Sequence, residues 1–305
     1  MTLVLENNAA RPRSKRTKRP GLWLMLPAAA AMLLAFGAPL IFSAWYSFTG
    51  WSLVRPASKS EFVGLSNYTR VLTDHEYWQA IGVTLTYAAS AVTIECILGI
   101  ALALLLNKQM FGRGIFRSLM LIPMVMTPAV VGLFWKLFFE ESDGLFNYFL
   151  TAAGLPALPW LGVSMALVSI VILDVWQATP FFMLIMLAGL QSMDRNIVEA
   201  AEIDGASRLQ VFRYITLPHL VPYIMVAAAF RIIGALADFD KIYLLTFGGP
   251  GNVTTTVSLY AYNRGFKIFD IGQTTAISWL FIILVLTITA PLIWHLLRGS
   301  STARH

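Results

Sequence analysis

Polar and ionisable side chains interrupt several long apolar runs of this sequence. Glu95 lies near the middle of one run, and Arg231 lies in another. Asp174 and Gln177 lie in a third, three residues apart, and therefore share one helix face. An ionisable group in a bilayer costs about 2.5–3.5 kcal/mol or more, so such groups normally pair or face a protein interior. Two interpretations stay open: ion pairs of Arg231 with Glu95 or Asp174, or a hydrated path for a solute.

Aromatic residues could serve such a path if the solute carries hydroxyl groups. An aromatic ring offers apolar area to the C–H face of a sugar ring, while carboxylates and amides bind hydroxyls. For Trp135 and Trp176, ordinary packing or anchoring at the membrane interface is the alternative. The candidate path residues are Trp135, Asp174, Trp176, Gln177 and Tyr243.

Patterns typical of catalysis or metal binding are absent from the sequence. There is no Gly-x-x-x-x-Gly-Lys-[Ser/Thr] phosphate loop, no His-Glu-x-x-His and no Gly-x-Ser-x-Gly. The four histidines are scattered, and Cys96 is the one cysteine, which excludes an intrachain disulfide or thiolate cluster. We therefore expect no catalytic residue, no metal site and no cofactor bound by this chain.

The composition indicates a membrane protein. Of 305 residues, 57% are hydrophobic and 12% are charged, about half the charged fraction of soluble domains. A transmembrane helix needs about 20 mostly apolar residues, and the first apolar run is too long for a signal peptide. We expect an all-α polytopic domain over 21–298, between a basic tail at 1–20 and a short tail at 299–305. The six expected spans are 22–48, 80–106, 115–138, 162–190, 219–237 and 272–297.

The distribution of basic residues predicts the orientation of these spans. The formal net charge is +6, and six Lys and Arg residues lie within 11–19, before the first span. This run could bind anionic phosphates such as nucleic acid, but we favour a topology signal, and no nucleic-acid partner is expected. With both termini inside, 14 Lys and Arg residues lie on the inner side and six on the outer side. The asymmetry predicts a multi-pass protein with both termini in the cytoplasm.

The cytoplasmic loop at 191–218 has a helical pattern of its own. Good helix formers fill 196–203, and Gly205 follows the acidic residue Asp204 at a position that suits the end of a helix. An amphipathic segment at 207–215 then leads to Pro218, which suits the first turn of the next helix. We therefore predict a short helix, a turn and a second helix across the cytoplasmic end of the bundle.

This loop resembles the signature of the permeases of ABC importers. The pattern is Glu-Ala-Ala, three residues, Gly, nine residues and Ile-x-Leu-Pro, and it matches without a gap. The resemblance implies a coupling helix that docks into an ATP-hydrolysing subunit, with Glu199 as the polar anchor and Gly205 allowing the turn. The implied coupling residues are Glu199, Ala200, Ala201, Asp204, Gly205, Ile215, Leu217 and Pro218.

Further patterns resemble the carbohydrate branch of these permeases, for maltose, trehalose or glycerol phosphate. They lie at 62–68, 240–250 and 260–266, and Phe247 departs from the Gly that many relatives carry. The resemblance implies a type I importer fold in the bacterial inner membrane. It also implies the first of two paired permeases, two ATP-binding subunits that use the ATP, and an extracytoplasmic solute-binding protein.

Three alternatives compete with an importer of a sugar or sugar-like polyol. An ABC permease for another solute would share the coupling loop. A secondary transporter should contain inverted repeats and broken helices near the midplane, which the sequence does not clearly show. A membrane enzyme would need a reactive cluster, and none is found. The sequence leaves open which solute is carried and which permease subunit contacts it.

Overall fold

A computed structural model describes residues 21–108 and 111–302, which are helical apart from turns, loops and isolated bridges. The basic run at 11–19 lies outside the described residues. The chain divides into two units, Met1–Trp45 and Tyr46–His305.

The described part of the first unit is an apolar helical run. It comprises α1 (Gly21–Met32), a π-helical segment η1 (Leu33–Gly37) and α2 (Ala38–Tyr46), which ends in the second unit. The stretch Met25–Tyr46 is long and apolar enough to cross a membrane, and none of its most apolar window is buried within the chain. A helix of this length spans about 30 Å, the thickness of the hydrocarbon core.

The second unit begins with short elements before the long helix α4 (His75–Asn107). These elements are η2 (Pro56–Ser60) and α3 (Ser66–Thr73). Asp74 caps α4, because its carboxylate accepts a hydrogen bond from the backbone N–H of Glu76 at 2.9 Å. This cap explains why the helix begins five residues before the expected span at 80–106.

The expected third span is not one straight helix. It consists of α5 (Arg113–Val125) and α6 (Pro128–Phe138), which meet at a bend of 97°. Thr127 has extended backbone angles, as expected for a residue before proline, because the proline ring disfavours the helical region there. The expectation of a continuous helix over 115–138 was therefore wrong at this point.

A short helix follows α6 in the loop that was predicted to face outward. This helix is α7 (Leu145–Ala152). The buried side chain of Asn147 organises the loop: its Oδ1 accepts from the Leu158 backbone and from Trp160 Nε1, both at 3.0 Å. Its Nδ2 donates to the carbonyl oxygens of Glu141 and Leu158. The side-chain amide of Asn147 thus forms hydrogen bonds with residues on both sides of α7.

The next helices contain the predicted cytoplasmic segment. Helix α8 (Ala166–Ser192) leads into α9 (Arg195–Ile203), and α10 (Arg208–Val211) follows after a turn. A π-helical segment, η3 (Phe212–Thr216), joins α10 to α11 (Leu217–Ala237). The helix therefore runs without a break from Arg208 to Ala237, whereas the sequence predicted a new helix near Pro218.

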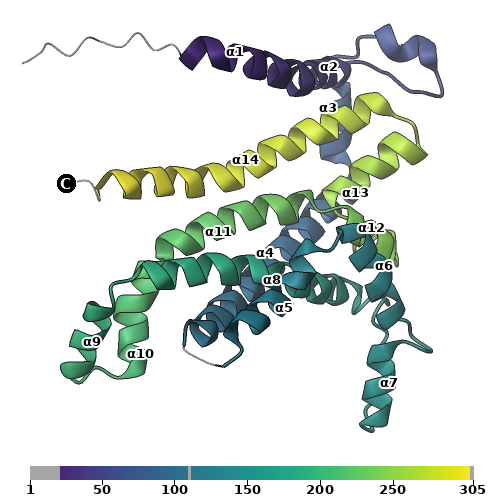
Figure 1. Ribbon diagram of the computed structural model, residues 1–305. Helices are drawn as coiled ribbons and strands as arrows, with labels where there is room; N and C mark the ends of the chain where they lie inside the picture. The colour runs from purple at the N-terminus through teal and green to yellow at the C-terminus, as the bar shows by residue number, and fades with distance from the viewer. Residues whose placement is uncertain (1–20, 109–110, 303–305) are drawn as a thin grey trace, which may run out of the picture. The chain divides into compact units, whose positions relative to one another are not determined.

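The chain closes with elements at the opposite end and a last long helix. These are α12 (Asp240–Thr246), α13 (Val257–Tyr262), η4 (Asn263–Lys267) and α14 (Ile271–Thr302). Helices α9 and α10 lie at one end of the second unit, and α6, α12 and α13 lie at the other (Figure 1). Helix α14 extends beyond the expected span at 272–297, and residues 303–305 of the expected tail lie outside the described part.

The core of the second unit lies where α4 crosses α8. Its apolar cluster includes Tyr87 from α4, Phe182 and Met186 from α8, and Leu236 from α11, all almost fully buried. At the crossing, Gly99 of α4 lies directly against Phe182 of α8. A glycine is needed there because an added Cβ would overlap the Phe182 side chain and reach the backbone nitrogen of Met183 at 3.0 Å.

This close approach gives a prediction about stability. We expect Gly99→Ala to destabilise the protein by about 1–3 kcal/mol, the usual cost of overpacking a core. The matched control is Gly82→Ala on the same helix, where an added Cβ meets nothing within 4 Å. Thermal unfolding of the purified protein in detergent should show a lowered midpoint for Gly99→Ala alone. Equal midpoints for the two variants would contradict the tight crossing.

Candidate functional site

The predicted coupling segment forms two helices joined by a tight turn. Asp194 caps α9 by accepting a hydrogen bond from Asn196 at 3.0 Å. Gly205 ends this helix in the left-handed region, with φ +84°. Ala206 N–H donates to Ala201 at 2.9 Å and Gly205 N–H donates to Glu202 at 3.1 Å, which is the Schellman arrangement. The sequence therefore positions the turn through a residue that adopts positive φ without strain.

A second cap starts the helix that follows. Ser207 and Gln210 form a reciprocal capping box, in which the Ser207 backbone N–H donates to Gln210 Oε1 at 2.7 Å. Helix α10 then continues through η3 into α11, which contains Leu217 and the exposed Pro218. The turn between α9 and α10 is thus held by backbone hydrogen bonds and caps on both sides.

The surface of this segment is unusual for an ordinary connecting loop. Four large apolar side chains are strongly exposed on it: Ile197, Ile203, Leu209 and Tyr214. Glu199 is also exposed and makes no hydrogen bond or ion pair within the described chain. Exposed apolar side chains beside unpaired charges are typical of a protein interface.

Two hollows flank the coupling segment. One, of about 360 Å³, is lined by Glu199 and Glu202 of α9 together with Gln191 and Asn107 from the bundle. The other, of about 330 Å³, lies over the turn. Ala200 is exposed and Ala201 is half-buried, while Asp204, Gly205 and Ile215 line the second hollow.

Inside the bundle, the charged residues form a buried ion-pair cluster, defined as Tyr87, Glu95, Asp174, Arg231, Asp238 and Lys241. Arg231 binds Glu95 through two nitrogen atoms, at 2.7 and 2.8 Å. It also binds Asp174 at 2.9 Å. The carboxylates of Glu95 and Asp174 are fully buried. Both ion pairs considered for Arg231 are therefore present.

A lysine extends this cluster toward the other end of the unit. Lys241 of α12 contacts the carboxylates of Asp174 and Asp238, and the Tyr87 hydroxyl donates to Asp238 at 2.7 Å. The cluster therefore joins α4, α8, α11 and α12. Each ionic group has an opposite charge in contact, which offsets the cost of burying it away from water.

Tyr87, Asp238 and Lys241 were not identified from the sequence. The two charged residues follow the apolar run at 219–237, so they were counted with an outer loop. Helical spacing offered no signal, because Asp238 lies between α11 and α12 while Lys241 lies in α12. Their contact with Asp174 depends on the chain turning back after α11, which the sequence pattern alone does not specify.

The candidate path residues fall into two groups. Trp135 and Trp176 lie with ring centroids 5.5 Å apart, and Trp135 also contacts Phe139 and Phe146. Trp135 is almost buried, whereas Trp176 is 40% exposed. Tyr243 lies in a different aromatic cluster and stacks on Phe239 at 5.2 Å. The structure therefore does not bring all five predicted residues into one site.

Gln177 occupies a distinctive position beside the bend between α5 and α6. Its Nε2 donates to the Met126 carbonyl oxygen at 3.0 Å, while its Oε1 is buried and has no hydrogen-bond partner. A buried acceptor without a partner costs about 1–3 kcal/mol. The unpaired Oε1 is thus available to a hydroxyl group that comes into this region.

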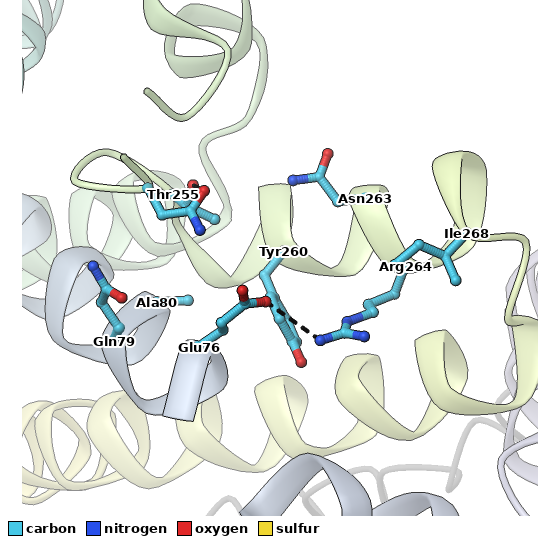
Figure 2. A pocket seen from close by; sticks show the side chains of 9 residues that line it. Glu76, Gln79, Ala80, Thr255, Tyr260, Asn263, Arg264 and Ile268 are labelled. Carbon is cyan, nitrogen blue, oxygen red and sulfur yellow. Dashed lines mark hydrogen bonds and ion pairs between the residues drawn. The ribbon is translucent and has the colours of Figure 1, made fainter. Parts of the chain in front are cut away.

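A polar hollow of about 320 Å³ lies at the end of the unit away from α9. Figure 2 shows Glu76 of α4 and Arg264 of η4 in its lining, where they form an ion pair at 3.4 Å. Arg264 also binds Asp74 at 2.6 Å. Burial and a hydrogen bond to Asp74 raise the pKa of Tyr260 above its ordinary value. These contacts tie the start of α4 to α13 and η4.

Comparison with known proteins identifies this architecture. Residues 95–297 match the family model described as binding-protein-dependent transport system inner membrane component. The chain belongs to this family. The permease is therefore a multi-pass inner-membrane transport component and not an enzyme, and the resemblance found in the coupling loop is confirmed at the level of the family.

Similar proteins cover almost the whole permease. The probable ABC transporter permease protein y4oQ of Sinorhizobium fredii is 66% identical over 93% of this chain and 92% of its own length. The trehalose/maltose transport system permease protein MalF of Thermococcus litoralis is 40% identical over 93% of this chain and 96% of its own. The trehalose transport system permease protein SugA of Mycobacterium tuberculosis is 36% identical over 86% and 83%.

A solved structure confirms the predicted fold of the permease. A chain of a bacterial ABC transporter for the import of alginate matches with a TM-score of 0.78 and 24% identity, over 92% of this chain and 96% of that chain. The described residues contain five helices long and apolar enough to span a membrane, and α5 with α6 as one broken span makes six. The all-α, type I importer-like fold is therefore correct.

Proposed function

We propose that this permease carries a sugar or sugar-like polyol into the cytoplasm as a subunit of an ATP-driven importer. The observation that carries the proposal is the similarity, over nearly the whole chain, to a permease named for trehalose and maltose transport, at 40% identity. The relative named for trehalose transport in Mycobacterium tuberculosis points to the same class of solute.

The segment 191–218 is the proposed contact with an ATP-binding subunit. Its exposed apolar side chains and the unpaired carboxylate of Glu199 support this role, because each would be buried or paired in a complex. The excess of basic residues on this side supports a cytoplasmic location for the segment and for both termini. The full assembly would contain a second permease, two ATP-binding subunits and a solute-binding protein.

The proposed solute path passes Gln177, next to the bend between α5 and α6. Its unpaired Oε1 supports this placement, because a sugar hydroxyl would supply the missing hydrogen bond. Trp176 lies on the same helix and is 40% exposed, so its ring can contact the apolar face of a sugar. Asp174 forms ion pairs with Arg231 and Lys241, so its proposed role is to hold the helices beside the path in place and not to bind the solute.

Uptake measurements test the proposal directly. A strain that lacks this chain, with and without the gene restored, would be given a panel of labelled disaccharides, monosaccharides, polyols and amino acids. We expect faster uptake of one or more carbohydrates in the restored strain, because their transport depends on this permease. Restored uptake of amino acids alone would reject the carbohydrate assignment. Isolation through a tag on this chain should also recover an ATP-binding subunit.

A further inference from the structure

Two arginines converge at the start of α5. Arg113 and Arg117 are one turn apart, and their guanidinium groups reach the same amide oxygen of Gln191 at 3.1 and 3.0 Å, in the amide orientation that satisfies these hydrogen bonds. Gln191 lies near the end of α8, where the chain leads into α9. The two cations are thus held close together at the end of the bundle predicted to face the cytoplasm.

No negative charge balances this pair among the described residues. Neither arginine forms an ion pair, and the buried Nε atoms of both lack a hydrogen-bond partner. The carboxylates of Glu199 and Glu202 line the hollow next to Gln191 but do not contact the arginines. Two like charges at this separation repel each other, so an anion at this position would stabilise the arrangement.

The N-terminus of α5 adds to the positive electrostatic field at the two arginines. The helix has 13 residues and begins at Arg113, and its N-cap Gly112 supplies no side-chain hydrogen bond. The first backbone N–H groups of a helix lack partners within the helix and carry a partial positive charge. A phosphate group is the anion that helix N-termini and arginines both bind well.

An apolar groove continues from this point along α5. The groove has a volume of about 400 Å³ and lies between α4, α5 and α8. The part of its lining that comes from α5 includes Met120, which lies three residues after Arg117 and therefore neighbours it on the helix surface. Phe111, just before α5, and Ile115, in its first turn, are strongly exposed. The residues lining the groove include Leu98, Leu102, Leu119, Ile122 and Trp176.

We propose that this surface binds one anionic phospholipid, with its phosphate at Arg113 and Arg117 and an acyl chain in the groove. The paired, unbalanced cations select the anionic headgroup, and the adjoining apolar groove selects a lipid over free phosphate. Basic pockets between helices at the cytoplasmic side of a membrane are suited to such headgroups. The headgroup site at Arg113 and Arg117 shares no residue with the proposed solute path, whereas Trp176 belongs to both the groove and that path.

Native mass spectrometry of the assembly, purified through a tag on this chain, tests the headgroup site. The double variant R113Q/R117Q should retain phosphatidylglycerol at least about tenfold less than the unaltered protein, since each arginine contributes to holding the headgroup. The matched control K108Q removes another exposed cation predicted to face the cytoplasm, outside the proposed contact with the ATP-binding subunit, and should retain the lipid normally. Equal loss in both variants, or an adduct of inorganic phosphate in place of lipid, would overturn the proposal.

Trp176 allows an independent test of the acyl chain. Phosphatidylglycerol and phosphatidylcholine with brominated chains would be added to the same assembly, and the fluorescence of Trp176 obtained by difference from W176F. We expect stronger quenching by the brominated anionic lipid, and its loss in R113Q/R117Q. If neither lipid quenches Trp176, the groove is covered by a protein helix and the lipid site is rejected.

Discussion

Replacing Arg231 with methionine is expected to destabilise the permease by about 3–5 kcal/mol, the usual cost of removing one partner of a buried ion pair. The carboxylates of Glu95 and Asp174 are fully buried, and both are bound to this guanidinium. Methionine fills much of the same volume but leaves Glu95 without a cation. The measurement is thermal unfolding of the purified protein in detergent, together with its abundance in the membrane.

A double variant separates lost charge pairing from lost packing. In E95M/R231M, the uncompensated carboxylate is removed with its partner, and Asp174 keeps its contact with Lys241. We expect the double variant to recover most of the lost stability, because replacing both members of a buried pair by apolar groups is often close to neutral. A double variant as unstable as R231M would show that the pair is not the cause.

Uptake is expected to fall below about one tenth of normal when Glu199 is replaced by lysine, while the protein stays in the membrane. The side chain is exposed and makes no contact within the described chain, so the substitution should change stability by only about 0.5 kcal/mol or less. A charge reversal at an interface costs far more, because close charge pairs are coupled by about 1.5–7 kcal/mol. The measurement is uptake normalised to permease abundance.

The matched control for this prediction is Glu140→Lys. Glu140 is an exposed carboxylate in the loop predicted to face outward, with no side-chain hydrogen bond or ion pair. It should leave uptake and abundance unchanged. Normal uptake by Glu199→Lys at normal abundance would remove the proposed contact with an ATP-binding subunit, whatever solute is carried.

The sequence predicted those features that depend on local patterns. Apolar runs located the long helices, and the turn at Gly205 was predicted from a glycine after an acidic residue. Its positive φ shows why that residue type is needed. The start of α4 was not predicted, because the expected span was located from its apolar run alone. The helix begins earlier, at the polar cap Asp74.

Features that depend on contacts between distant segments were not predictable in the same way. The bend between α5 and α6 has a local cause in Pro128, but its angle is fixed by packing of α6 against α12. Gly132 allows that packing, with an added Cβ meeting Leu244 at 3.2 Å. The packing of α12 also brings Lys241 into contact with Asp174, so its place in the ion-pair cluster could not be predicted from the sequence.

The ion-pair cluster restricts how the permease can change shape. Pulling α12 away from α8 would separate Lys241 from Asp174 far from water, at a cost of several kcal/mol. Helices α4, α8, α11 and α12 should therefore travel as one rigid body during each transport cycle. Sliding between apolar surfaces costs less free energy, because no ion pair has to be separated. The relative motions should therefore concentrate at apolar helix contacts, such as the one between α14 and α11.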